Sequence, residues 1–110
     1  MQRIYADMEH ADVIVLASPV YFYTWNAAMK SVIDRTFAIK NRLKDKKFYL
    51  LCTCAGKKKI AIMLDCYHQY IDCFSNNTDG GYLVGYNLRK PGEINNNDII
   101  EKAFQMGKTL

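Results

Sequence analysis

A cluster of aromatic residues is the feature of this sequence best suited to contact a ligand. The cluster begins two residues after Pro19 and consists of Tyr21, Phe22, Tyr23 and Trp25. Aromatic faces bind flat apolar rings by stacking and by burial of their surface. A second stretch, Thr53 to Gly56, ends in small residues that let the backbone approach a ligand closely. The two stretches are therefore interpreted as a ring-binding surface or, alternatively for the aromatic cluster, as plain packing or a subunit contact.

Each of these stretches follows a predicted strand. Residues 13–17 form a continuous apolar run, VIVLA, of the kind buried on both faces of a parallel sheet. Pro19 lacks the amide hydrogen that a central strand needs, so the strand should end there. Residues 48–53, FYLLCT, predict a second strand. Because ligands of open α/β sheets bind at the carboxyl ends of the strands, we expect the two stretches to meet there.

A helix is predicted after the aromatic cluster, over residues 27–39. Asn26 is a favourable cap for its first turn. Met29, Ile33 and Phe37 recur at i, i+4 and i+8, which gives one apolar stripe for packing on a sheet.

The rest of the chain alternates between helical and strand patterns. Residues 1–11 read as the end of a helix, and residues 61–74 as a full helix. Gly80-Gly81 opens a third strand over residues 82–88, and Asp98 begins a last helix with a capping-box pattern. Strict alternation predicts an α/β fold in which parallel strands are joined by right-handed crossovers.

Length and composition indicate one globular domain. The chain has 110 residues, of which 50% are apolar and 24% charged, enough to bury a core. No apolar run approaches the ~18 residues of a membrane span, and no signal-peptide pattern is present at the N-terminus. We therefore expect a soluble, cytoplasmic protein with no membrane partner.

The net charge of +4 is mild and lies largely in residues 40–47 and in Lys57 to Lys59. These runs are interpreted as solvated loops or, alternatively, as a binding surface for an anionic ligand such as a dinucleotide phosphate. Nucleic-acid binding is not expected, because the aromatic residues cluster in one loop and do not interleave with the basic runs.

The four cysteines are interpreted as buried, reduced thiols. Cys52 and Cys54 face the same side of a predicted strand, and Cys66 and Cys73 share one face of a predicted helix. Zinc sites use closely spaced ligand pairs of the C-x₂₋₄-C type, which these spacings do not match. No metal is therefore expected, although a thiol or metal protein that uses Cys52 and Cys54 remains an alternative.

At residues 11–37 the sequence ADVIVLASPVYFYTWNAAMKSVIDRTF resembles the flavodoxin-like NADPH-dependent FMN reductases and iron–sulfur flavoproteins. SPVYF and the helix ending in Ile33-Asp34-Arg35 are the specific parts of the likeness. The likeness continues in three further segments. The next strand of that family resembles KKFYLLCTCAG, its last strand resembles GGYLVGYNLRKPGEI, and its closing helix resembles EKAFQMGKTL. The resemblance implies a three-layer flavodoxin-like parallel sheet of about three strands, equivalent to strands 3-4-5 of the order 2-1-3-4-5.

The sequence departs from that family at its start. No part of this sequence corresponds to the family's first strand, its phosphate-binding loop of the G-S-P-R type, its first helix or its second strand. The iron–sulfur cysteine motif has no counterpart here either. We therefore expect residues 1–110 to form a single, incomplete flavodoxin-like domain, truncated at its N-terminus. The open edge of residues 13–17 should then be met by a second copy of the chain, making a homo-oligomer, or by an upstream segment.

The resemblance implies a flavin enzyme that uses FMN and NAD(P)H. Hydride would pass from the nicotinamide to FMN, and electrons would go on to a small-molecule acceptor such as a quinone or nitro compound. No catalytic side chain is required. The residues expected to contact the cofactor are Ser18, Pro19, Val20, Tyr21, Phe22, Trp25, Asn26, Thr53, Cys54, Ala55 and Gly56. The alternative is a non-enzymatic fragment that serves only as an interaction or dimerisation module.

Overall fold

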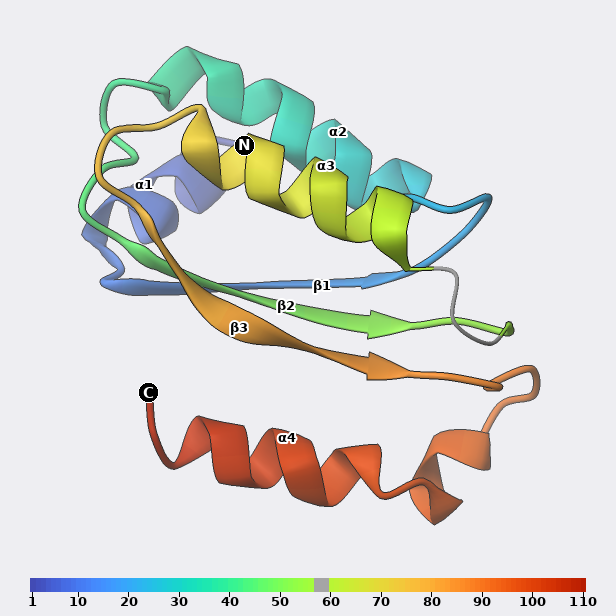
Figure 1. Ribbon diagram of the computed structural model, residues 1–110. Coiled ribbons are helices and arrows are strands. Elements are labelled where there is room, and N and C mark those ends of the chain that lie inside the picture. The colour runs from blue at the N-terminus through green and yellow to red at the C-terminus, as the bar shows by residue number, and fades with distance from the viewer. Residues whose placement is uncertain (57–59) are drawn as a thin grey trace.

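The computed structural model describes residues 1–56 and 60–110, and within them three parallel strands form one sheet. The strands are β1 (Val13–Pro19), β2 (Lys47–Thr53) and β3 (Thr78–Gly85), in the order β1-β2-β3. Figure 1 shows all three running in the same direction. The predicted α/β fold with parallel strands is confirmed.

Helices cover both faces of the sheet. The helices α1 (Gln2–His10), α2 (Ala27–Arg35) and α3 (Ala61–Asp72) lie on one face, and α4 (Ile99–Gly107) lies on the other (Figure 1). Two short 3₁₀ helices, η1 (Thr36–Ile39) and η2 (Glu93–Asn96), lie between these elements. The described part of the chain has no helix that is both long and apolar enough to cross a membrane.

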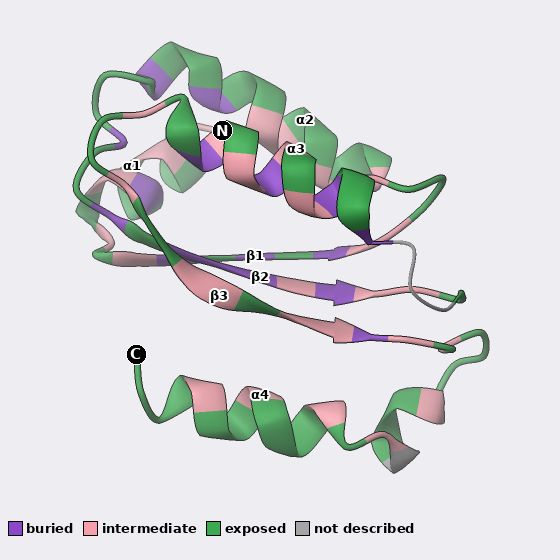
Figure 2. Ribbon diagram, in the orientation of Figure 1, coloured by how far each residue is buried: buried purple, intermediate pink, exposed green. Residues whose placement is uncertain are grey.

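The core fills the space between the sheet and the three helices α1, α2 and α3. Residues of β1 and β2 alternate in direction, so every second side chain points into this core. Its central members are Leu16, Phe48, Leu50, Met63 and Tyr67. Figure 2 shows the buried residues gathered on these facing surfaces.

The prediction that residues 13–17 are buried on both faces is wrong. Ile14 and Leu16 are buried, but Val15 is 45% exposed and Ala17 is also exposed on the opposite face. The reason is that α4 packs chiefly on β3 and leaves this side of β1 largely uncovered. β1 is also an edge strand of the described sheet, so both one face and one edge of this apolar strand are uncovered.

The predicted stripe on residues 27–39 is correct for its first two members only. Met29 and Ile33 pack against the core, whereas Phe37 is 71% exposed. The helix tightens to 3₁₀ geometry at Thr36, which turns Thr36 and Ile39 inward in place of Phe37.

β3 begins four residues earlier than predicted and already ends at Gly85. Gly80 and Gly81 therefore lie inside the strand, opposite an irregularity at Phe48/Tyr49. A Cβ atom at Gly80 would lie 2.5 Å from the ring of Tyr49. The glycine is thus required by the close passage of this aromatic ring, and not by a turn before the strand.

The capping box predicted at Asp98 is also replaced by other contacts. The first amide of α4, that of Ile99, donates to the side chain of Asn97 over 3.0 Å, and Asp98 pairs with Lys102 over 3.3 Å. Of the predicted inner face, Ile100 and Phe104 are largely exposed.

The basic segment 40–47 lies before β2, at the amino end of the sheet, whereas the predicted ligand site lies at the carboxyl end (Figure 1). Within it, Lys46 is buried and its ammonium group donates to the carbonyls of Glu9 and Ala11, over 2.8 and 2.7 Å. Lys46 therefore satisfies carbonyls at the carboxyl end of α1, and the segment is not a binding surface for an anionic ligand at the predicted site. The other run, Lys57 to Lys59, lies outside the described residues.

Candidate functional site

The end of β1 is fastened to the start of α2. The amide of Asn26 donates to the buried hydroxyl of Ser18 over 3.1 Å, and the side chain of Asn26 accepts from the amide of Met29 over 2.9 Å. Asn26 is therefore the helix cap that the sequence predicts. These contacts fix both ends of the loop that carries the aromatic residues.

The aromatic residues occupy a tight turn within this loop. The amide of Tyr21 donates to the carbonyl of Thr24 over 3.1 Å, and the amide of Thr24 donates back over 3.3 Å. Between them, Phe22 and Tyr23 have positive φ angles of 48° and 75°. The turn projects its side chains outward, and Phe22 is 96% exposed.

The second loop, Thr53 to Gly56, is joined directly to the first. The amide of Val20 donates to the carbonyl of Thr53 over 2.8 Å. The amide of Cys54 donates to the carbonyl of Gly85 over 2.9 Å, so this amide is not available to a ligand. The amides of Ala55 and Gly56 donate to no backbone carbonyl among the described residues, so they are the donors that this loop can offer.

A cavity of about 210 Å³ lies between the two loops. Five of the predicted contact residues line it, namely Val20, Phe22, Cys54, Ala55 and Gly56. Tyr23 completes its wall. The structure thus brings the aromatic turn and the small-residue loop together around one hollow at the carboxyl end of β1 and β2.

A second cavity, of about 330 Å³, opens on the α4 side of the sheet. Ser18, Pro19 and Thr53 line it, together with apolar residues of β2, β3 and α4. These three predicted contact residues therefore border a different hollow from the other five.

The three remaining predicted contact residues lie apart from both cavities. Tyr21 is 62% exposed on the outside of the turn, and Asn26 caps α2. Trp25 is buried in the core, so its ring is not part of the exposed aromatic surface.

Two residues outside the predicted set of contacts also belong to the site. Tyr23 is part of the aromatic cluster but not of that predicted set, and it lines the smaller cavity. Arg89 donates from Nε to the carbonyl of Ala55 over 3.2 Å and so brings a positive charge to the second loop. Nothing in the local pattern around Arg89 indicates this contact, because it joins residues 34 positions apart.

The cysteines near the site are weakly acidic thiols. Burial, reinforced by the neighbouring Cys54, raises the pKa of the Cys52 thiol to about 12. Burial also raises the pKa of Cys54, which outweighs the opposite effect of a hydrogen bond with the backbone of Gly56. Neither thiol is therefore activated as a nucleophile or metal ligand. The prediction of buried thiols is correct for Cys52 only, because Cys54 and Cys66 are partly buried and Cys73 is exposed.

Metal ligands are not grouped in the described structure. Within residues 1–56 and 60–110, no cluster of three or more His, Cys, Asp or Glu side chains could hold an ion.

The comparison with protein families identifies residues 1–71, which include β1, the aromatic turn, the second loop and most of α3, as a match to the NADPH-dependent FMN reductases. The chain belongs to this family. The resemblance predicted from SPVYF and the Ile33-Asp34-Arg35 helix is thereby confirmed.

This FMN reductase family member is also similar to the iron-sulfur flavoprotein of Archaeoglobus fulgidus. The two are 31% identical over 105 residues, which make up 94% of this chain and 46% of the relative. The chain thus spans about half the length of that protein.

Solved structures confirm the fold of this FMN reductase family member. It matches a structure described as thermophilic tryptophan halogenase from Streptomycin violaceusniger with a TM-score of 0.72 and 16% identity, over 97% of this chain and 70% of the other. It matches the Trp repressor binding protein from Bacillus subtilis with a TM-score of 0.71 and 18% identity, over 96% and 66%. The flavodoxin-like fold class is confirmed.

Proposed function

We propose that the chain contributes the ring-binding half of a cytoplasmic FMN-dependent NAD(P)H oxidoreductase. Family membership supports a flavin oxidoreductase in general terms. The observation that supports this particular site is the cavity of about 210 Å³ between the aromatic turn and residues Cys54 to Gly56. Its combination of aromatic side chains and free amides suits one edge of a planar, polar-rimmed ring.

The described residues fit the flavin ring better than the flavin phosphate. Phe22 and Tyr23 offer apolar faces, and the amides of Ala55 and Gly56 offer donors beside them. The basic segment 40–47 lies at the other end of the sheet. We therefore propose that these loops hold the ring, and we derive no phosphate contact from them.

When bound, FMN supplies the redox chemistry, accepting hydride from NAD(P)H and passing electrons to a small acceptor such as a quinone or nitro compound. The chain's own residues position the ring and shape its electrostatics. The free amides and the guanidinium of Arg89 favour negative charge at the edge of the ring they face. The aromatic turn excludes water from one side, and no acidic, basic or nucleophilic side chain is required.

The experiment is an FMN titration of the purified chain, followed by flavin absorbance and fluorescence, and then an assay of NADPH oxidation with a quinone. A yellow protein or saturable fluorescence quenching would support the proposal. A colourless chain that leaves flavin fluorescence unchanged at high protein concentration would refute it for these 110 residues.

The second candidate is a fragment without enzymatic activity that acts as an interaction or dimerisation module. The uncovered face and edge of β1 favour this alternative, since both are surfaces for another polypeptide. A colourless preparation that self-associates would select it, whereas a yellow preparation would select the oxidoreductase.

A further inference from the structure

A third cavity, of about 410 Å³, lies between the end of α2 and the end of α3. Its lining comes from the last turn of α2, from η1 and the residue after it, and from the last turn of α3 and the two residues beyond. Both helices end shortly before the next strand begins, which places the cavity at the amino end of the sheet (Figure 1). The proposed flavin site lies at the carboxyl end, so the two sites are separate.

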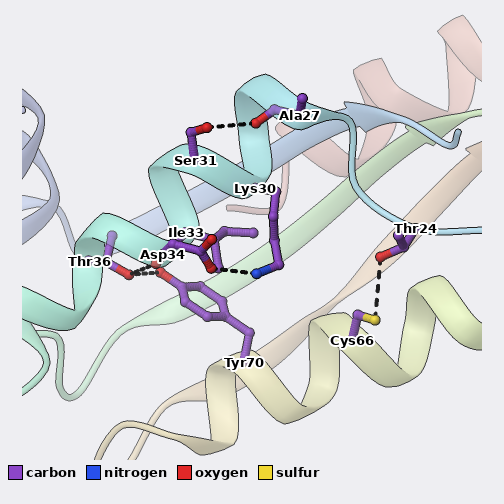
Figure 3. A network of polar contacts seen from close by, with 9 residues as sticks. All are labelled: Thr24, Ala27, Lys30, Ser31, Ile33, Asp34, Thr36, Cys66 and Tyr70. Atoms are coloured by element: carbon purple, nitrogen blue, oxygen red, sulfur yellow. Dashed lines mark hydrogen bonds and ion pairs between the residues drawn. The ribbon is translucent and has the colours of Figure 1, made fainter.

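Tyr70 and Phe74 form one aromatic wall of this cavity. Their rings meet edge to face, with 5.1 Å between the ring centroids. The hydroxyl of Thr36 donates to the carbonyl of Ile33 over 2.6 Å, so the hydroxyl of Tyr70 donates to Thr36 over 2.9 Å (Figure 3). Phe48 contacts the ring of Tyr70 from the core, with 6.2 Å between the centroids. The aromatic wall is therefore held in place before any ligand binds.

Phe37 adds a further aromatic surface that the fold itself does not use. It lines the cavity and is 71% exposed, because the 3₁₀ geometry of η1 turns Thr36 and Ile39 into the core in its place. Within the described residues, the ring of Phe37 makes no contact with the rings of the aromatic wall. A flat apolar group in the cavity would therefore bury ring surface that the chain leaves open.

The charged residues of the cavity leave one positive charge without a partner. Lys40 lies with its ammonium group 4.6 Å from the centroid of the Phe37 ring, and it forms no ion pair with any described residue. The other charged lining residue, Asp34, is paired with Lys30 (Figure 3). The cavity thus combines open aromatic surface with an ammonium group held beside it by a cation–π contact.

We propose that this cavity binds a small planar aromatic anion, with its ring against Phe37 and the aromatic wall and its anionic group on Lys40. The aromatic surfaces bury the ring, and the ammonium group supplies a charge-assisted hydrogen bond. An organic cation fits less well, because Lys40 already lies over Phe37 and repels a second positive charge. The proposal goes beyond the flavin chemistry and does not depend on it.

The test is a titration of the chain with 2-naphthoate, followed by the amide signals in the nuclear magnetic resonance spectrum. We expect saturable binding with a dissociation constant below ~1 mM, and the largest shifts at residues 33–40 and 70–74. 2-Naphthamide keeps the ring but has no charge, so it should bind at least ~5-fold more weakly.

Two variants test the ring contact and the charge separately. Phe37→Ala and Lys40→Met should each weaken 2-naphthoate binding at least ~5-fold. Phe104→Ala and Lys108→Met are the matched controls, because Phe104 is also exposed and carries the ammonium group of Lys108 4.8 Å from its centroid, on α4 and away from this cavity. The controls should change the affinity less than ~2-fold.

Several results would overturn the proposal. Binding that does not saturate, or shifts centred on the aromatic turn or on α4, would place the naphthoate elsewhere. Equal affinities for 2-naphthoate and 2-naphthamide, or an unchanged affinity in Lys40→Met, would remove the role of the charge. If the signals of residues 33–40 and 70–74 moved with protein concentration in the absence of ligand, the cavity would be a contact between copies of the chain and not a ligand site.

Discussion

The hydroxyl of Thr24 donates a hydrogen bond of 3.4 Å to the sulfur of Cys66, and so links the aromatic turn to α3 (Figure 3). Replacing the hydroxyl by a methyl group in Thr24→Val removes this link while keeping the side-chain volume. We expect a loss of about 0.5–1 kcal/mol in the free energy of unfolding, in line with one weak neutral hydrogen bond. Amide hydrogen exchange at residues 21–24 should become faster.

Thr24→Ser is the control for this prediction, because it keeps the donor and should behave as the wild type in both measurements. Equal exchange rates at residues 21–24 in the wild type and in Thr24→Val would show that Cys66 does not hold the turn.

Lys46 stabilises the fold through its ammonium group, which donates to the carbonyls of Glu9 and Ala11 at the end of α1. In Lys46→Met the side chain still fits a buried position, but both carbonyls lose their charged donor. We expect the free energy of unfolding to fall by about 2–3 kcal/mol in a urea titration. The neighbouring Lys47 is exposed, and Lys47→Met should cost about 0.5 kcal/mol or less. Similar losses in the two variants would contradict the capping role of Lys46.

Asp79 makes the stability of the chain depend on pH. Burial acts to raise the pKa of its carboxyl, but hydrogen bonds from Tyr67, from the amide of Gly81 and from His68 outweigh burial and lower the pKa. A carboxyl with a lowered pKa in the folded state stabilises the fold above its unfolded pKa of about 4, and this stabilisation is lost as the pH falls through the folded value. The acid limb of the stability curve should therefore depend on Asp79.

The measurement is the urea midpoint between about pH 5 and pH 2.5 for the wild type and Asp79→Asn. Asp79→Asn should be less stable at pH 5, and the difference between the two chains should shrink as the pH falls. Asp65→Asn, on the exposed side of α3, should run parallel to the wild type. A constant difference between the wild type and Asp79→Asn at every pH would count against the linkage.

The arrangement of strands and helices could be predicted from the sequence because it depends on local patterns. The apolar runs before Pro19 and Cys54, and the Asn26 cap, identify two strands and the helix that follows the first. The exposure of Val15 could not be predicted from its apolar run. It depends on how far α4 extends across the sheet, which is a property of the whole fold.

In the candidate site, too, local patterns could be predicted from the sequence and contacts between distant residues could not. The residue types of the aromatic turn and of Cys54 to Gly56 predict a ring-binding surface, and the structure brings the two stretches to one cavity. The burial of Trp25 and the contact of Arg89 with Ala55 depend on the path of the chain between distant elements. The positive φ angle of Phe22 likewise does not follow from its residue type.

Tyr21 lies outside the cavity and is 62% exposed, so we expect it to contact the part of the flavin ring that extends beyond the cavity. In Tyr21→Ala the FMN affinity should fall by about 1–3 kcal/mol, the value of burying one large side chain. A fluorescence titration measures this loss directly. Tyr82→Ala, which removes a partly exposed tyrosine from β3, is the matched control and should leave FMN affinity unchanged. If Tyr21→Ala bound FMN as tightly as the wild type, Tyr21 would not contact the ring.

The free edge of β1 should lead the chain to associate with a second copy. Among the described residues β1 pairs with β2 on one side only, and residues 13–17 include no Lys or Pro to protect the other side. Val15, 45% exposed, adds an apolar surface next to that edge. We therefore expect the sedimentation-velocity mass to rise with protein concentration, and amide exchange along residues 13–17 to slow as it does.

Val15→Lys introduces the charged residue that protects natural edge strands, so it should shift the chain toward the monomer. Ile62→Lys is the matched control, because Ile62 is a similarly exposed aliphatic residue on α3, on the other side of the sheet. It should associate as the wild type does. A wild-type chain that stays monomeric at high concentration, with fast exchange along residues 13–17, would show that the edge of β1 tolerates solvent and needs no partner.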